Sequence, residues 1–310
     1  ALHAHSRLSD LGIATQLLDD AELTQRFPAY SNCTLAPDVV AGTPHDCGGG
    51  GRHLLETDGG YMDPVNAIED LREACLAAGV DVRVSSAVKN VQLEGGRVCG
   101  LVLASGETLS TPLLVNAAGP WCKQLYEAAG LQQRWNLLPT RIQVLYLDRP
   151  EQLTGDIPVT VDLAGGIYFR TQNLGQQLVV GSVLEADERE SISDPDRLQR
   201  EADDDFLQRV LHSLHHRFPS LPYRGKVRGY SGMYTMNRDD VHPIVGPTAI
   251  DGFWVANGFS GHGFKLGPAI GAMLAKEITG EASDFDTAVP LQFFSIDRDP
   301  IAADSKSVLA

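Results

Sequence analysis

A glycine-dense segment near the end of the chain reads Phe253-Trp-Val-Ala-Asn-Gly-Phe-Ser-Gly-His-Gly-Phe-Lys-Leu-Gly-Pro-Ala-Ile-Gly271. Five glycines fall between positions 258 and 271, and a helical pattern begins at about Leu266. A glycine-rich loop that enters a helix lets backbone approach a ligand closely, and it aims N–H groups and the positive end of the helix dipole at that ligand. The segment therefore predicts a turn that faces a cofactor.

Composition bounds the classes of function that fit this chain. With 310 residues, 43% hydrophobic and 21% charged, it can bury the core of two domains or of one large α/β unit. A net charge of −15 argues against nucleic acid or an anionic membrane as a partner. No apolar run approaches the roughly 18 residues of a membrane helix, and no signal-peptide pattern opens the chain.

The cysteines are five in number and irregularly spaced, without a Cys-x-x-Cys pair. This pattern argues against a disulfide framework or a zinc site and favours a reducing, cytoplasmic setting. Three histidines between residues 212 and 216 lack a partner motif, so we expect them on a solvated helix face and predict no metal. The residues concerned are Cys33, Cys47, Cys75, Cys99, Cys122, His212, His215 and His216.

Periodicity in the first half of the chain predicts mixed α/β structure. Residues 1–30 read as one or two surface helices, and residues 31–60 are rich in turns. Asp63 and Pro64 suit the N-cap and first position of a helix that Gly79 ends. Strands are then predicted at 80–84, 88–93, 98–104 and 113–117, the last of them apolar on both faces like a buried parallel strand.

The second half changes character. Short alternating strands joined by tight turns predict an antiparallel sheet, followed by a long helix over 195–218. Strands at 225–236, 243–245 and 253–256 then lead into a last helix, and the tail from residue 281 is weakly patterned. The four alternating strands are expected at 142–147, 159–161, 167–170 and 178–183. The pattern predicts a nucleotide-type α/β domain interrupted by a substrate domain.

Three motifs, at residues 232–235, 240–246 and 258–265, resemble the C-terminal flavin-contacting segments of the D-amino-acid oxidase superfamily. They read Gly232-Met-Tyr-Thr235, Asp240-Val-His-Pro-Ile-Val-Gly246 and Gly258-Phe-Ser-Gly-His-Gly-Phe-Lys265. The nearest resemblance is to its sarcosine oxidase, dimethylglycine dehydrogenase and glycine oxidase branch. Segments 17–28, 58–64 and 115–121 are similar to the family in the same order, so the resemblance covers nearly the whole chain.

The resemblance implies an α/β fold with α+β elements, in which a Rossmann-like FAD/NAD(P)-binding domain is interrupted by an antiparallel-sheet substrate domain. We expect substrate-domain segments at 1–60 and 140–236, FAD-binding segments at 61–139 and 237–285, and a tail at 286–310. The family's opening Gly-x-Gly-x-x-Gly unit, which holds the FAD pyrophosphate, has no match in this chain. Three explanations stay open: a fragment, which the absent initiator methionine favours, a second chain that completes the site, or lost FAD binding.

By resemblance, Gly232 stands where monomeric sarcosine oxidase carries the cysteine that bonds to its flavin, so the FAD is expected to be non-covalent. The backbone around His262 is implied to face the flavin pyrimidine edge. The full set of implied cofactor-binding residues is Val88, Ala118, Gly119, Trp121, Gly232, Met233, Gly258, Ser260, Gly261, His262, Gly263, Phe264 and Lys265.

Lys265 is the strongest candidate for a residue that touches substrate. A cation near a helix N-terminus is unfavourable, so its position is easier to explain if it faces an anion; the resemblance implies the substrate carboxylate. The alternative is an exposed surface lysine. Tyr234 and His262 complete the catalytic candidates, although His262 also fits a structural donor. Substrate-binding candidates are Tyr168, Arg170, Tyr234 and Lys265, and the first two also fit a core role.

The expected function is therefore an FAD-dependent oxidoreductase that oxidises the C–N bond of a small amino acid or N-methyl amino acid by hydride transfer to flavin N5. Electrons would pass to O₂ or to an electron carrier. The competing hypothesis is a non-catalytic, flavoprotein-like subunit or assembly factor with impaired FAD binding.

Overall fold

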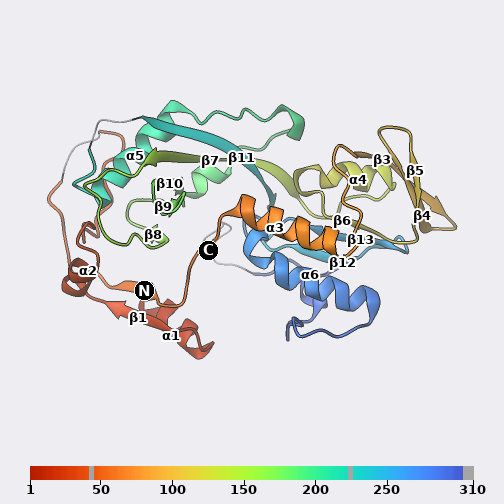
Figure 1. Ribbon diagram of the computed structural model, residues 1–310, viewed down its shortest axis with the longest axis horizontal. Coiled ribbons are helices and arrows are strands. Elements are labelled where there is room, and N and C mark those ends of the chain that lie inside the picture. The colour runs from red at the N-terminus through yellow and green to blue at the C-terminus, as the bar shows by residue number, and fades with distance from the viewer. Residues whose placement is uncertain (42–44, 223–225, 303–310) are drawn as a thin grey trace. The chain divides into compact units, whose positions relative to one another are not determined.

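The computed structural model describes residues 1–41, 45–222 and 226–302. The chain divides into two compact units, which are described separately. Unit 1 comprises Ala1–Ala67, Gln143–Asp187 and Gln199–Ser231, and unit 2 comprises Ile68–Ile142, Glu188–Leu198 and Gly232–Ala310. Two long strands, β7 (Leu137–Asp148) and β11 (Val227–Asn237), contribute residues to both units (Figure 1).

The central feature of unit 1 is a five-stranded sheet in the order β11-β7-β10-β9-β8. Strand β10 (Gln177–Ser182) pairs antiparallel with both β7 and β9 (Ile167–Gln172), and β8 (Thr160–Asp162) pairs antiparallel with β9. Buried and half-buried residues alternate along β9, because successive side chains in a strand point to opposite faces. The predicted antiparallel sheet is confirmed.

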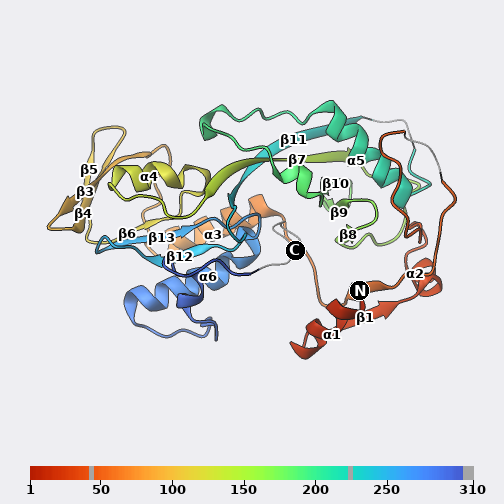
Figure 2. The same ribbon diagram turned by 180° about the vertical axis from the view of Figure 1, so that it is seen from behind.

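Helix α5 (Asp204–Arg217) covers one face of this sheet, as Figures 1 and 2 show. Its apolar side chains pack with those of β7, β9 and β10 in the core of unit 1. The side chains that form this contact include Phe206, Val210, Leu214, Leu145, Ile167, Phe169, Leu178 and Val180.

The predicted helix over 195–218 is wrong in its first half. Residues 195–197 form a single 3₁₀ turn, and the α-helix begins only at Asp204. Between them the backbone pairs with β11 instead: Glu201 forms an antiparallel bridge with Tyr230, and the Arg200 carbonyl accepts from Ser231 N–H. Long-range pairing thus overrides the local helical pattern. The first residue of the predicted strand 225–236 lies outside the described residues.

The N-terminal part of unit 1 contains the two expected helices, α1 (Leu2–Asp10) and α2 (Asp20–Arg26), separated by strand β1 (Thr15–Leu18). Asp19 and Glu22 form a reciprocal capping box at the start of α2. Strand β1 pairs antiparallel with β2 (His53–Glu56), a strand not predicted within the turn-rich region 31–60.

Unit 2 contains two small sheets, with orders β12-β13-β6 and β3-β4-β5. The pairing of β6 with β13 is parallel, as predicted from the apolar run at 113–117, although Leu114 and Val115 are only half-buried. Helix α6 packs on the first sheet through Ile270 and Met273 (Figure 2). The element bounds are β3 (Val88–Glu94), β4 (Arg97–Leu103), β5 (Thr108–Ser110), β6 (Leu114–Asn116), β12 (Ile244–Pro247), β13 (Phe253–Asn257), α4 (Cys122–Ala128) and α6 (Gly263–Thr279).

Helix α3 (Pro64–Ala77) begins where predicted, because the Asp63 side chain accepts hydrogen bonds from the N–H groups of residues 65 and 66. Its apolar stripe is not a core face, however. Val65, Ile68 and Leu71 are 69, 55 and 60% exposed, and none of the helix, all of which is described, is buried. The strand predicted at 80–84 is wrong. These residues are irregular and exposed, and they form no strand pairing with other described residues. No helix of the described residues is long and apolar enough to cross a bilayer.

A buried carboxylate fixes the C-terminal region onto unit 2. The Asp240 side chain is 0% exposed, pairs with the Arg298 guanidinium, and accepts hydrogen bonds from His242 N–H and Ile301 N–H at 3.0 and 2.8 Å. The Arg298 guanidinium also lies 4.4 Å from the centre of the Trp135 ring. The weakly patterned tail is therefore an integral part of the fold as far as residue 302.

The pH dependence of stability should report this ion pair. Burial by itself raises the pKa of Asp240, but the hydrogen bonds from Arg298, Ile301 and His242 outweigh it and lower that pKa. A depressed folded-state pKa gives stability that is present above the unfolded pKa of about 3.9 and is lost as pH falls. We expect Asp240→Asn to lower the free energy of unfolding by about 3–5 kcal/mol at neutral pH, because Arg298 is left buried without its partner. The difference from wild type should narrow in acid.

Urea unfolding followed by circular dichroism between acid and neutral pH measures this effect. Asp251→Asn is the matched control, because the ion pair of Asp251 with Arg97 is exposed and should contribute little. Equal losses in the two variants would contradict the assignment.

Candidate flavin site

The turn between β13 and α6 requires glycine at two positions. Gly258 and Gly261 have φ angles of +70° and +83°, which other residues rarely adopt. A Cβ at Gly258 would also lie 2.7 Å from a methyl carbon of Leu137, and a Cβ at Gly261 would lie 2.7 Å from the Tyr234 ring. Backbone conformation and close packing thus both exclude a larger side chain at these positions.

Ser260 ties this turn to the end of β11. Its N–H donates to the Thr235 carbonyl at 3.0 Å, and its hydroxyl accepts from Asn237 N–H at 2.9 Å and donates to the Gly258 carbonyl at 3.2 Å. Ser260 is fully buried and has a φ of +48°, an uncommon conformation for a residue other than glycine. The hydrogen bonds hold a strained turn in one conformation.

A second turn lies beside the same strand. Gly119, with a φ of +52°, opens a 3₁₀ turn at the end of β6, and a Cβ at this position would lie 4.0 Å from the Thr235 hydroxyl. That hydroxyl is buried and has no hydrogen-bond partner among the described residues. A buried, unpartnered hydroxyl costs free energy unless a ligand or water satisfies it. The 118–121 turn, Thr235 and the 258–261 turn therefore fit the edge of a polar cofactor such as FAD.

Helix α6 presents its N-terminus at this turn. His262 occupies the N-cap position, and no side chain in the described chain caps the helix. Lys265 lies in the first turn, where its side chain is exposed, and desolvation by the surrounding protein atoms lowers its pKa. Uncapped N–H groups and the helix dipole favour an anion here, and the Lys265 ammonium adds a positive charge.

Other predicted cofactor residues line the same part of unit 2. Gly232 has no described heavy atom within 4 Å of where its Cβ would be, so open space adjoins it. Met233 and Tyr234 follow on β11, both half-buried, and Phe264 in α6 is 48% exposed. The structure thus gathers residues 232–235 and 258–265 around one turn, but their contacts with a cofactor remain predictions.

Of the remaining cofactor candidates, Val88 lies elsewhere in unit 2, whereas Ala118 and Trp121 belong to the 118–121 turn. Val88 starts β3, where it pairs with Leu103, and Ala118 N–H is held by the Asn116 side chain at 3.2 Å. The Trp121 indole donates to Asp196 at 2.9 Å, so its N–H already has a partner.

The substrate candidates Tyr168 and Arg170 belong to unit 1. Both lie on the half-buried face of β9, opposite to the face that packs in the core. The Tyr168 ring lies over Gly181, where an added Cβ would be 2.3 Å from it, and the Arg170 guanidinium lies 5.0 Å from the centre of the Tyr61 ring. These residues form a polar and aromatic face within their own unit.

Sequence reasoning missed Thr235 and Asn237 as parts of this site. Thr235 ends the quoted motif at 232–235, and strand alternation places it on the face of Met233. Only the structure shows that its hydroxyl is unpartnered and that Asn237 holds Ser260.

A glycine turn that leads from a parallel strand into an uncapped helix, beside a second turn at the end of the neighbouring strand, defines a protein of the nucleotide-cofactor-binding class. The family model described as FAD dependent oxidoreductase matches residues 1–277, and the chain belongs to this family.

Related proteins agree with this assignment. The chain is 33% identical over 177 residues to FAD-dependent oxidoreductase domain-containing protein 1 of Bos taurus, covering 54% of this chain and 35% of that protein. It is 26% identical over 275 residues to D-amino acid dehydrogenase of Xanthobacter autotrophicus, covering 88% and 61%. The chain thus spans about a third of the vertebrate relative and less than two thirds of the bacterial one.

Solved structures share the fold. L-proline dehydrogenase from P. horikoshii superposes with a TM-score of 0.74 at 21% identity, covering 93% of this chain and 69% of that one. Glycine oxidase from Geobacillus kaustophilus gives 0.69 at 20% identity, covering 96% and 70%. The predicted family and the predicted FAD-binding fold class are confirmed.

Substituting a turn glycine should test the turn directly. Gly261→Ala forces a Cβ into the Tyr234 ring and places alanine at positive φ, which costs about 1–2 kcal/mol before any steric term. Gly271→Ala is the matched control, because this helical position is open, is not followed by proline, and alanine there should stabilise by about 0.5–1 kcal/mol. Chemical denaturation measures both changes. A Gly261→Ala protein as stable as wild type would contradict the geometry.

Proposed function

We propose that the full-length protein uses non-covalent FAD to oxidise the C–N bond of a small amino acid or N-methyl amino acid. The observation that carries the proposal is Lys265, a cation in the first turn of the uncapped helix that follows the cofactor-facing turn. Such a cation has a reason to be there if it binds an anion, and the carboxylate of an amino acid is an anion of suitable size.

The names of the relatives support this substrate class. They include a D-amino acid dehydrogenase, a sarcosine dehydrogenase of Mus musculus and the structurally similar glycine oxidase and L-proline dehydrogenase. Each of those names specifies a substrate with an amine and a carboxylate on one carbon framework. We extend the class, but no single substrate, to this protein.

In this proposal each part of the site has one task. Lys265 binds the substrate carboxylate and thereby orients the carbon that loses hydride. Tyr234 lines the pocket, and the N–H groups of residues 261–264 face the flavin pyrimidine edge, with His262 as a structural donor or a base. When bound, FAD would supply N5 as the hydride acceptor and a route for the electrons to O₂ or to a carrier. Tyr168 and Arg170 are the proposed substrate-domain contribution.

The domain assignment belongs to the same proposal. Residues 61–139 and 237–285 would form the FAD-binding segments, and residues 1–60 and 140–236 the substrate segments, with 286–310 as the tail. The end of this tail, residues 303–310, lies outside the described part of the chain. At the position of Gly232 no side chain is present to bond to flavin, so acid precipitation of the full-length protein should release the flavin into solution.

We further propose that the unit that binds the FAD phosphates lies outside residues 1–310, in the same polypeptide or in a partner chain. The exposed apolar stripe of α3 supports this idea, because adjoining apolar side chains on one helix are typical of a contact surface. The stripe is formed by Val65, Ile68, Leu71 and Leu76.

Replacing Lys265 should weaken substrate binding more than chemistry. In the full-length enzyme, Lys265→Met removes a charge-assisted bond of about 1.5–3 kcal/mol, so KM should rise about 10- to 100-fold. Because the pKa of Lys265 is lowered, its ammonium loses its proton at a lower pH than that of an ordinary lysine. The wild-type KM should therefore begin to rise at a lower alkaline pH than an ordinary lysine would give. Steady-state kinetics with a set of N-alkyl and D- or L-amino acids measure both effects.

Lys276→Met is the control, because Lys276 lies in the last turn of the same helix and pairs with Asp286 instead. An unchanged KM in Lys265→Met would contradict the role of Lys265. A full-length protein that cannot be reconstituted with FAD would favour the competing non-catalytic subunit.

Flavin retention should depend on residues outside this chain. Residues 1–310 expressed alone are expected to retain far less than one equivalent of FAD, because pyrophosphate recognition supplies much of the affinity for a dinucleotide. The full-length protein should be yellow and should be bleached anaerobically by its substrate. Absorption spectra of the two proteins, purified side by side, make the comparison; a stoichiometric flavin spectrum from residues 1–310 would contradict the prediction.

A further inference from the structure

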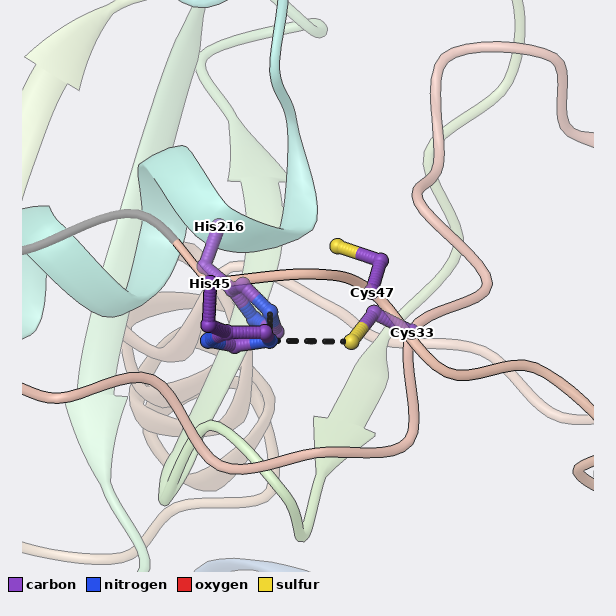
Figure 3. Close-up of side chains that lie close together, drawn as sticks. All are labelled: Cys33, His45, Cys47 and His216. Carbon is purple, nitrogen blue, oxygen red and sulfur yellow. Dashed lines mark hydrogen bonds between the residues drawn. The ribbon is translucent and has the colours of Figure 1, made fainter.

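Two cysteines and two histidines from distant parts of the sequence meet in unit 1. Figure 3 shows Cys33, His45 and Cys47 on the loop after α2, and His216 at the end of α5, with their side chains directed toward one another. The Cys33 sulfur lies 3.2 Å from His45 Nε2, which lies 3.3 Å from His216 Nε2. One potential ligand atom from each of the four residues lies within 4.8 Å of the others.

We propose that Cys33, His45, Cys47 and His216 bind one Zn²⁺ ion. A tetrahedral zinc site with bonds of about 2.3 Å to sulfur and 2.0–2.1 Å to nitrogen requires ligand atoms about 3.3–3.8 Å apart. Two of the separations, 3.2 and 3.3 Å, lie close to this range, and all four ligand atoms lie within 4.8 Å of one another, so side-chain movements would complete the tetrahedron. Two thiolates and two imidazoles are a donor set that zinc prefers.

A rigid frame already holds the two halves of this site together. Arg217, adjacent to His216, forms a buried bidentate ion pair with Asp162 at 2.8 and 2.9 Å. Its other N–H groups donate to the Ser31 carbonyl and, at 3.1 Å, to the Cys33 carbonyl. Ser31 N–H in turn donates to the Arg217 carbonyl at 2.8 Å. Cys33 and His216 are thus fixed relative to each other independently of any metal.

The loop that carries the other two ligands is closed at its base. Thr34 N–H donates to the Gly48 carbonyl at 2.9 Å, and the Thr34 hydroxyl approaches the same carbonyl at 3.2 Å. This contact brings Cys47 back beside Cys33 across the loop. His45, half-buried, then lies between the Cys33 sulfur and His216.

The local electrostatics suit a cation. His216 lies in the last turn of α5, where the helix dipole is negative and a bound cation is stabilised. Two thiolates would neutralise the charge of the ion, so the site would carry no net charge.

With four protein ligands the site would be closed and structural. It would join the segments that carry Cys33, His45 and Cys47 to the last turn of α5. The sequence argued against zinc because the cysteines are irregularly spaced and form no Cys-x-x-Cys pair. His216 is also far from the other three ligands in sequence, so no short motif contains all four. The expectation that His212, His215 and His216 lie on a solvated face is wrong, since His215 is 4% exposed and the other two are half-buried.

Metal analysis of the full-length protein, purified under reducing conditions without added chelator, tests the proposal. We expect about one zinc per chain by elemental mass spectrometry, with less than about a tenth of that in Cys33→Ser, Cys47→Ser and His216→Ala. Cys99→Ser and His212→Gln are the controls, because both residues lie outside the cluster, and both variants should keep the zinc.

A second measurement begins with the wild-type protein, so its first result does not depend on how the variants fold. Metal-free wild-type protein titrated with Co²⁺ should show the visible bands of tetrahedral cobalt and an ultraviolet thiolate-to-cobalt charge-transfer band. His216→Cys should retain the metal and strengthen the charge-transfer band, because a third thiolate replaces the imidazole ligand. If His216 did not bind the metal, this substitution would leave the band unchanged.

Two results would overturn the proposal. The first is a Co²⁺ titration of reduced wild-type protein that shows no charge-transfer band. The second is a disulfide between Cys33 and Cys47 that persists under the reducing conditions of the purification. It would be detected as two cysteines that resist alkylation both before and after chelation. Thiols that are protected before chelation and reactive afterwards would support the metal site.

Discussion

The candidate flavin site depends on one buried carboxylate, Asp240, which lies outside the glycine turn at 258–261 in sequence. Its oxygens bind Arg298, the backbone of residues 242 and 301, and the Asn237 side-chain amide at 2.9 Å. Asn237 N–H then holds the hydroxyl of Ser260. The conformation of the turn is therefore set by a hydrogen-bonded chain that begins at an ion pair.

The same network stabilises a costly backbone conformation. Val241 has a φ of +59°, which is rare for a β-branched residue and costs of order 1–3 kcal/mol. Hydrogen bonds on either side, from Asn237 to the His242 carbonyl and from His242 N–H to Asp240, keep it in place. A pair of buried charges is weak evidence for net stability, but it strongly specifies the path of a loop. In unit 1, Asp162 and Arg217 act in the same way on the loop that carries Cys33.

How far the sequence predicts this structure depends on the range of the interactions. The strands of the antiparallel sheet and the start of α3 follow from local alternation and capping, and they were predicted correctly. The turn at 258–261 was also predicted, because backbone positions with positive φ are usually occupied by glycine, which is visible in the sequence. The predicted start of α5 was wrong, because pairing of the preceding residues with β11 determines where the helix begins. A local sequence pattern does not reveal such long-range pairing. The contact of Arg298 with Asp240 and the Cys/His cluster join segments 58 or more residues apart, so single-sequence periodicity had no signal for them.

The charge of the whole chain bears on the choice of substrate. A net charge of −15 makes the approach of an anion unfavourable on average, and Lys265 at a helix N-terminus offsets this field only locally. A zwitterionic amino acid carries no net charge, so it approaches without long-range repulsion. Its carboxylate still gains the short-range attraction of Lys265 and of the α6 dipole once it arrives. Under the proposed function, this charge distribution would favour amino acids and N-methyl amino acids over simple carboxylic acids as substrates.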